Sequence, residues 1–258
     1  QKTAVQYHSV FQLLFIKYLF CLLFSFFIAR KNKVNKFYIS NNYKIQITRC
    51  ILSTLESCFF VLSFRYLALA DAHTIGSLSP VLVLVFSYII LKEKISLSTW
   101  IAIIISFVGV ILIMRPGINI FNPYLIIPLL AAFFYSLYQI ATRLNAEHDN
   151  NETMLFYNGL IGSIITLVFS YFFWQPLHAF SFIFFIFVGL FFCTGLYLQI
   201  KALSISPASI LAPYHYSIII WAILFGFLVY NEIPDIFTLF GAIIIVASGI
   251  FIFRYSKK

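Results

Sequence analysis

Charged side chains are scarce in this sequence, and acidic ones are the scarcest. Asp, Glu, Lys and Arg make up 10% of the 258 residues, with eight acidic residues against 17 basic ones. An ordinary soluble domain has about 25%. Hydrophobic residues instead make up 62% of the chain, and phenylalanine alone occurs 32 times. A soluble domain of this size has too little interior to bury that much apolar surface. The composition therefore excludes a soluble enzyme and predicts a protein that folds in lipid.

The motifs that catalysis and metal binding need are also missing. The sequence has no G-x-S-x-G nucleophile motif, no H-E-x-x-H zinc motif and no Walker phosphate-binding loop. Its cysteines lie inside apolar runs, form no C-x-x-C pair and have no histidine at metal-ligand spacing. We therefore expect no metal and no cofactor, and ATP-driven transport has no support. The cysteines are Cys21, Cys50, Cys58 and Cys193.

Long apolar runs fill the chain instead. Nine of them approach the ~20 residues that a helix needs to cross a hydrocarbon core of about 30 Å. Lipid offers no partner to unpaired backbone groups, so helices must form these spans. The sequence thus predicts an all-α membrane protein in which short connections make successive helices antiparallel. The predicted spans are Ser9–Ala29, Ile47–Leu69, Thr74–Leu91, Leu97–Met114, Pro123–Thr142, Thr153–Trp174, Phe180–Ile200, Ser209–Tyr230 and Ile236–Phe253.

The basic residues predict the orientation of these helices. Lys and Arg gather in alternate connections, and loops rich in them stay in the cytoplasm. Topology thus explains the net charge of +9, and we expect the lipid bilayer and a small-molecule substrate as partners, not nucleic acid. The C-terminus is expected on the cytoplasmic side of a bacterial cytoplasmic (inner) membrane. The basic connections contain Arg30, Lys31, Lys33, Lys36, Lys44 and Arg49, then Lys92 and Lys94, then Arg143, then Lys201, and finally Arg254, Lys257 and Lys258.

Two stretches of the chain are similar to each other, which predicts an internal repeat. Ser79–Pro116 and Tyr216–Tyr255 each contain an apolar span, a short loop with a glutamate, and a second span with a glycine and a terminal arginine. The loop glutamates, Glu93 and Glu232, are separated by an odd number of spans and so fall on opposite faces of the membrane. Inverted repeats of this kind are a recurring plan of secondary transporters. We expect these glutamates to act as structural caps or gates.

The repeat also predicts how the chain is divided. We expect a first repeat in residues 1–116 and a second in residues 123–258. An odd number of spans, an external N-terminus and a first residue Gln1 together suggest that a helix precedes the sequence. The expected fold is then an inverted repeat of five plus five helices, with its first helix missing here.

Three stretches resemble the EamA-type members of the drug/metabolite transporter superfamily. The first contains RYLALADAHTIGSLSP and an apolar run ending in LKEKI, the second ALSISPASILAPYHYS leading to NEIPD, and the third TLFGAIIIVASGIFIFRY. FIKYLF, around Lys17, is a weaker match. The likeness covers nearly the whole chain and depends on the order and spacing of the motifs.

The resemblance implies ten helices in two inverted halves around a central cavity that opens alternately to each side. It also implies a carrier that leaves its substrate chemically unchanged. The half with LAPYHYS and NEIPD is similar to transporters that take up S-adenosylmethionine in intracellular bacteria, while other relatives export amino acids. Two residues depart from the pattern: Lys17 stands where the family commonly has arginine, and Glu56 lies in a span that is usually apolar.

Glu56 and Lys17 are charged residues that lie deep inside predicted spans. A bare carboxylate in a membrane costs about 2.5–3.5 kcal/mol even on the lenient insertion scale. Glu56 therefore contacts a substrate ammonium or couples proton movement, or else it forms a structural ion pair with Lys17 or is a neutral buried acid. Lys17 is too deep in its span to snorkel to the interface. It could pair with Glu56 or bind a substrate carboxylate.

A second group of candidates surrounds a proline. Pro213 removes a helix donor, and interrupted helices at mid-membrane often build binding sites. The neighbouring aromatic residues could stack on a planar or cationic group, or could simply pack around a kink, and Pro80 could kink the first half similarly. Helical spacing brings Tyr135 and Tyr138, or Tyr135 and Gln139, onto one face of their helix. The candidates are His215, Tyr214, Tyr216, Tyr138 and Gln139.

The sequence thus favours a secondary transporter of a small organic metabolite, amino-acid-like or S-adenosylmethionine-like. Two other functions stay open. A membrane-embedded lipid-modifying enzyme would need histidines or acidic residues clustered at one interface, and the loops lack them. An accessory membrane subunit would leave the intramembrane charges unexplained.

Overall fold

The computed structural model describes the chain except for residues 1, 93–96, 115–121, 177–178 and 256–258. The predicted all-α class is confirmed, because every regular element in the described part is helical. The elements are α1 (Lys2–Tyr7), α2 (Val10–Lys31), α3 (Tyr43–Ser63), α4 (Leu69–Gly76), α5 (Ser79–Ile90), α6 (Leu97–Met114), η1 (Pro123–Leu125), α7 (Ile126–Asn145), α8 (Asn151–Phe172), α9 (Ala179–Ile205), α10 (Ala208–Leu211), η2 (Ala212–Tyr216), α11 (Ser217–Tyr230) and α12 (Ile236–Tyr255).

These helices include the apolar segments that a membrane protein needs. Within the described residues, six helical segments are long and apolar enough to cross a membrane, and three shorter apolar helices accompany them. Together they correspond to the predicted spans. The predicted end of the second span and start of the third span are corrected. Helix α3 ends at Ser63, not at Leu69, and the next span begins at Leu69, not at Thr74. The intervening Phe64–Ala68 forms a turn that the hydropathy pattern did not reveal.

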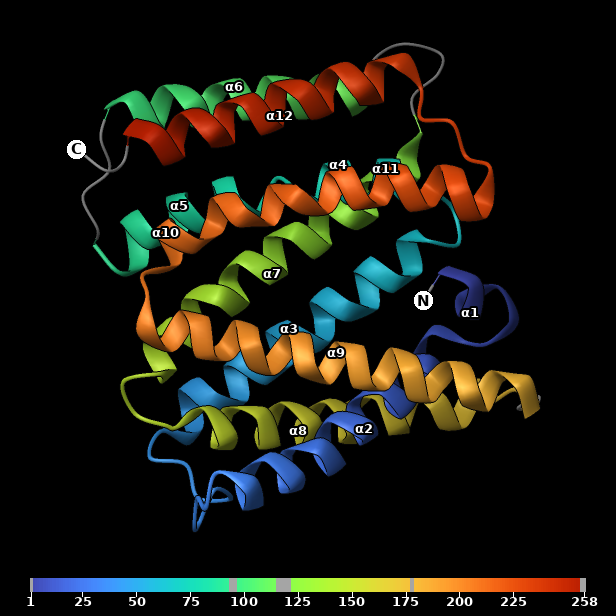
Figure 1. The fold of residues 1–258 in the computed structure, drawn as a ribbon, viewed down its shortest axis with the longest axis vertical. Coiled ribbons are helices and arrows are strands. Elements are labelled where there is room, and N and C mark those ends of the chain that lie inside the picture. Colours follow the sequence, from blue (N-terminus) through green and yellow to red (C-terminus); the bar gives the residue numbers. More distant parts are fainter. Residues whose placement is uncertain (1, 93–96, 115–121, 177–178, 256–258) are drawn as a thin grey trace.

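The helices pack in pairs that each combine the two halves of the sequence. Helix α2 lies along α8, α3 along α7, α4 along α11, and α6 along α12 (Figure 1). In this view α6 and α12 lie at one edge of the bundle and α2 and α8 at the other, while α3 and α7 cross the middle obliquely. The middle of the bundle is therefore built by helices from both halves.

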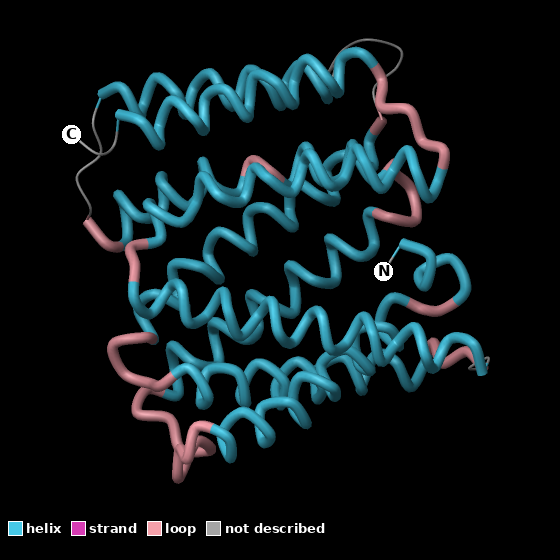
Figure 2. Tube along the Cα trace, in the orientation of Figure 1, coloured by secondary structure: helices cyan, strands magenta, loops and turns pink. Residues whose placement is uncertain are grey.

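Two of the spans are interrupted, and the interruptions face each other. The span from Leu69 to Ile90 breaks between α4 and α5, and Pro80 occupies the first turn of α5. Figure 2 shows this break as a short loop segment within the helical trace. The span around Pro213 instead tightens into the 3₁₀ helix η2, which packs against α5. Both predicted interruptions are thus observed, and they bring irregular backbone to the centre of the protein.

Candidate functional site

Three cavities follow one another through the bundle beside these interruptions. The Lys2 cavity has a volume of about 360 Å³ and is lined by Lys2, Phe60, His73 and Tyr230, among others. The Glu56 cavity, about 150 Å³, also contains Phe60 and His73 in its wall. The Gln139 cavity, about 280 Å³, is lined by Gln139 and Gln199 and shares Tyr135 and His215 with the Glu56 cavity. Neighbouring cavities share wall residues, so each neighbouring pair adjoins at the side chains of the residues that line both.

Glu56 lies in the wall of the middle cavity. Its Oε2 accepts a hydrogen bond of 3.0 Å from the hydroxyl of the adjacent Ser57. The side chain is partly buried on α3 and faces the interrupted span, whose Gly76 and Ser79 line the same cavity. The buried hydroxyl of Ser79 has no hydrogen-bond partner within the described part of the chain. A carboxylate and an unpaired hydroxyl therefore face one small cavity.

Lys17 approaches Glu56 through Ser57. Its Nζ donates a hydrogen bond of 3.0 Å to Ser57 Oγ and lies 4.0 Å from the centre of the Phe192 ring. The Tyr18 hydroxyl lies 3.1 Å from the same Ser57 oxygen. Among the described residues Lys17 and Glu56 form no direct ion pair. The lysine is 3% exposed and is not in the described walls of the three cavities.

His215 and Tyr135 form the boundary between the Glu56 and Gln139 cavities. Their ring centres lie 5.1 Å apart with an angle of 33° between the planes. The Tyr135 hydroxyl accepts a hydrogen bond of 2.9 Å from Gln199 on α9. Gln139 lies one helical turn beyond Tyr135, and the exposed Tyr214 lines the same cavity. The structure thus brings Glu56, His215, Gln139 and Tyr214 to two adjoining cavities.

The other two candidates lie away from the described walls of these cavities. Tyr138 is 1% exposed, and the guanidinium carbon of Arg49 lies 5.7 Å from the centre of its ring. Tyr216 is 5% exposed and packs against α12 at Gly249. Helical spacing predicted Tyr138 on one face with Tyr135, and the two ring centres do lie 6.2 Å apart, while the Tyr138 ring also packs beside Arg49 of α3.

Arg49 is a buried cation that sequence reasoning counted with a basic connection, although it lies within the predicted span Ile47–Leu69. It is fully buried in α3, where its Nε donates to Gln46 Oε1 at 3.3 Å and its Nη2 donates to the carbonyl oxygen of Met154. Among the described residues no carboxylate pairs with it. The sequence did not reveal this burial because the polar residues of the basic loop continue without a break up to Arg49. Gln46, one helical turn earlier, was the residue that could have indicated a buried polar partner.

Polar contacts stand at each end of the row of cavities. Glu232 forms an ion pair with Lys2 and accepts the backbone N–H of Leu69, the first residue of α4, at 2.8 Å. At the other end, Arg143 on α7 donates to the carbonyl oxygens of Leu203 and Ser204 at the end of α9. Glu93, the predicted counterpart of Glu232, lies outside the described residues. Glu232 therefore joins three helices near one end of the row.

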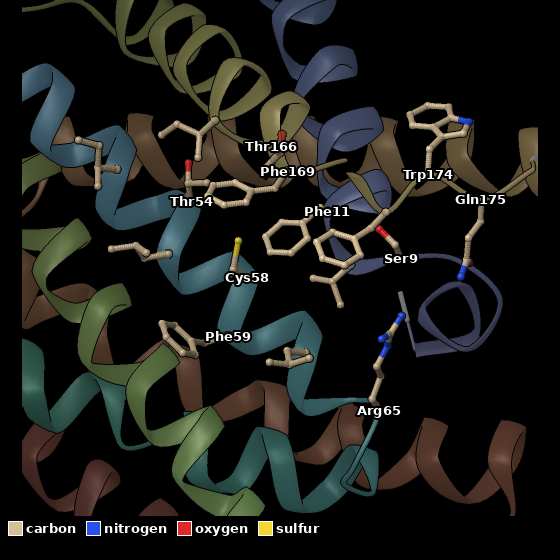
Figure 3. Close-up of a pocket in the computed structure, with 16 residues that line it drawn as sticks. Ser9, Phe11, Thr54, Cys58, Phe59, Arg65, Thr166, Phe169, Trp174 and Gln175 are labelled. Atoms are coloured by element: carbon tan, nitrogen blue, oxygen red, sulfur yellow. The ribbon is translucent and has the colours of Figure 1, made fainter. Parts of the chain in front are cut away.

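A larger cavity than these three lies on the opposite side of α3 from Glu56. It is a groove of about 710 Å³ between α2, α3 and α8, lined by Phe11, Thr54, Cys58, Phe169 and Arg65, among others (Figure 3). Glu56 and Phe60 face the middle of the protein, whereas Thr54 and Cys58 face this groove. None of the predicted site residues lines it.

Metal chemistry has no support within the described part of the chain. No group of three His, Cys, Asp or Glu residues there could hold a metal ion. All four cysteines are free, and all but Cys58 are buried. The described walls of the cavities offer carboxylate, ammonium, hydroxyl, amide, imidazole and aromatic groups, which can bind a molecule.

Comparison with known proteins agrees with this arrangement. The sequence profile of the EamA-like transporter family matches residues 1–115 and 122–254. An S-adenosylmethionine uptake transporter of Rickettsia bellii is 28% identical over 81% of this chain and 73% of its own length. A riboflavin transporter of Vibrio cholerae is 28% identical over 70% of this chain and 61% of its own. A protein of known crystal structure superposes with a TM-score of 0.73 at 14% identity, covering 97% of this chain and 92% of its own, which bears on the fold alone.

Proposed function

Because this chain belongs to the EamA-like transporter family, we propose that it is a secondary carrier for a small amphoteric metabolite that works by alternating access. The family and the named relatives make it an integral membrane transporter of a small molecule and not an enzyme. The substrate and the mechanism are the proposal, and both are argued from the row of cavities.

The position of Glu56 is the observation that carries this proposal. A carboxylate inside a membrane span carries a high desolvation cost. Such residues face a cavity or the interior of the bundle and mark substrate or ion pathways. Glu56 lies in the middle cavity of the row, between the two interrupted spans. There it would attract a positively charged group, and Ser57 holds its orientation. Lys17, bonded to the same Ser57, keeps a second charge close by.

The aromatic boundary next to Glu56 suggests the rest of the substrate. Tyr135 and His215 offer ring faces at the junction of the two cavities, and such faces bind flat rings and cations. Gln139 and Gln199 add amide groups in the adjoining cavity. A flat ring linked to a cationic centre and an amino-acid group would match this order. S-adenosylmethionine, the molecule named for the Rickettsia bellii relative, has this chemistry.

The pairing of helices supports alternating access. Transporters of this type rock one repeat against the other around a central site, and broken helices line that site. Here each helix pair joins the two predicted repeats, α4 with α11 and α6 with α12. The contacts at Glu232 and at Arg143 would open in turn. The basic loops would face the cytoplasm of an inner membrane, together with the C-terminus.

Uptake into vesicles containing the complete protein tests the proposal. We expect labelled S-adenosylmethionine to accumulate in protein-containing vesicles and not in protein-free ones. S-adenosylhomocysteine has the same ring and amino-acid group but no sulfonium charge, so it should compete more weakly than unlabelled S-adenosylmethionine. Equal competition would remove the cation site at Glu56 from the proposal. No accumulation of S-adenosylmethionine under an ion gradient of either direction would refute the substrate class.

A further inference from the structure

We propose that the groove between α2, α3 and α8 binds one acyl chain of an anionic phospholipid, with the lipid phosphate at Arg65. This site is separate from the row of cavities and does not depend on the substrate. Figure 3 shows the groove with Arg65, Ser9, Trp174 and Gln175 toward one end and Thr54 toward the other.

The walls of the groove are apolar although two threonines belong to them. Thr54 donates its hydroxyl hydrogen to the carbonyl oxygen of Cys50 at 2.9 Å, and Thr166 donates its own to that of Gly162 at 2.6 Å. Both hydroxyls are therefore satisfied within their helices and offer little to a polar ligand. Phe11 and Phe169 stack with ring centres 5.1 Å apart, and both line the groove. A polar substrate would lose its hydration here without gaining partners, whereas a hydrocarbon chain would not.

The length of the groove matches one leaflet of a bilayer. On α3 the lining residues extend from Ile51 to Leu62, which at 1.5 Å per residue is about 16 Å. Half of a hydrocarbon core of about 30 Å is about 15 Å. Ile51, Phe169 and Phe173 remain more than a third exposed, so the groove opens sideways toward lipid. An acyl chain could enter directly from the membrane and lie along α3.

Charge at one end selects the headgroup. Arg65 is exposed, and its Nε and Nη2 donate to the carbonyl oxygens of Val5 and His8 at 3.3 and 3.1 Å. These bonds fix the guanidinium at the groove, while no carboxylate in the described part of the chain neutralises it. Ser9 caps the N-terminus of α2 at the same place, and a helix N-terminus favours negative charge. Trp174 at this end is typical of the membrane interface. A lipid whose phosphate binds beside Arg65 would therefore have its acyl chain pointing into the groove.

A photoreactive lipid tests this site in the complete protein. Two probes carry the same diazirine-labelled acyl chain, one on phosphatidylglycerol and one on phosphatidylcholine, each added in trace amount to phosphatidylcholine vesicles. We expect the anionic probe to label the segments around Cys58 and Phe169 about fivefold more than the zwitterionic probe, since a basic residue near an anionic headgroup contributes about 1 kcal/mol. Equal labelling by the two probes in the unaltered protein would overturn the proposal.

Charge variants locate the headgroup. Arg65→Gln should lower anionic labelling to the zwitterionic level, whereas Arg65→Lys should retain most of it. Lys44→Gln removes an exposed cation from the opposite end of the same helix and should change nothing. If Arg65→Gln labels as strongly as the unaltered protein, or if a transported substrate displaces the probe from the groove, the lipid site is refuted and the groove is an entry path.

Discussion

The ring of Tyr135 on α7 lies 5.1 Å from the imidazole of His215 in η2, and this pair separates the Glu56 cavity from the Gln139 cavity. The two rings come from helices that the chain places far apart. Gln199 on α9 holds the tyrosine hydroxyl, so three elements determine where the ring stands. Both residues line both cavities, so the pair stands where the two cavities adjoin.

Tyr135→Leu removes a ring face that the proposed substrate contacts. A cation or ring on an aromatic face contributes about 0.5–2 kcal/mol, so we expect KM for S-adenosylmethionine uptake to rise by about 2–30-fold. Tyr135→Phe keeps the ring and loses the bond to Gln199, so its effect should be smaller. Tyr171→Leu, at a residue that is 80% exposed on α8, is the control. Equal KM values for the Leu and Phe variants would remove ring stacking from the proposal.

Glu56→Gln keeps the shape of the side chain and removes its charge. If Glu56 holds the cationic group of the substrate or couples proton movement, this change should abolish or uncouple uptake while the protein still inserts into the membrane. Glu147→Gln makes the same chemical change at an exposed residue between α7 and α8 and should transport normally. Uptake, amount of membrane protein and thermal stability are measured together. Normal uptake by Glu56→Gln would exclude Glu56 from the site.

Ser57 should be more important for stability than its size suggests. Its hydroxyl accepts from Lys17 and donates to Glu56, and the Tyr18 hydroxyl lies 3.1 Å away. Ser57→Ala leaves these buried groups with one partner fewer, and an unsatisfied buried polar group costs about 1–3 kcal/mol. We therefore expect a clear fall in the melting temperature in detergent. Ser63→Ala, on the same helix and also fully buried, loses only a local bond to the carbonyl oxygen of Phe60 and should melt close to the unaltered protein.

The double change distinguishes a structural cluster from a binding site. If the cluster serves stability, Glu56→Gln and Lys17→Gln should each lower the protein yield and the double variant should restore it. If it serves binding, the double variant should fold and remain without uptake.

Hydropathy and loop charge predicted the helices because a segment that crosses lipid must be predominantly apolar and must pair its backbone groups within a helix. The same reasoning gave Glu56 and His215, since a charge or a proline in a span is rare enough to be noticed. It could not give Tyr135 and Gln199 as partners, because that contact depends on how α7 and α9 cross. It counted Arg49 with a basic connection and did not reveal its burial, since that burial depends on the Met154 carbonyl of a distant helix. It also missed the groove between α2, α3 and α8, whose apolar residues resemble those of other apolar spans.

The sides of the membrane are testable from two loops. The positive-inside rule places the loop between α7 and α8 in the cytoplasm and the end of α8 outside. In intact cells a membrane-impermeant maleimide should label Gln175→Cys and leave Glu147→Cys unlabelled until the cells are broken. Both residues are exposed, and the native cysteines other than Cys58 are buried, so the parent protein supplies the background. The reverse labelling pattern would invert the proposed topology.

Gly159 should be the glycine at which an added methyl group does most damage to the contact between the predicted repeats. Helices α2 and α8 approach so closely there that a Cβ on Gly159 would lie 2.5 Å from the backbone nitrogen of Leu22. Backbone cannot turn aside as a side chain can, so the helices must separate, and such overpacking costs about 1–3 kcal/mol. Small residues at helix contacts are what allow this packing in lipid. Gly195 on α9 is the matched control, since nothing lies within 4 Å of its Cβ position, and alanine there favours the helix by about 1 kcal/mol. We therefore expect Gly159→Ala to melt several degrees below the unaltered protein and Gly195→Ala to melt at or above it. If the two variants melt alike, α2 and α8 do not pack as closely as the structure shows.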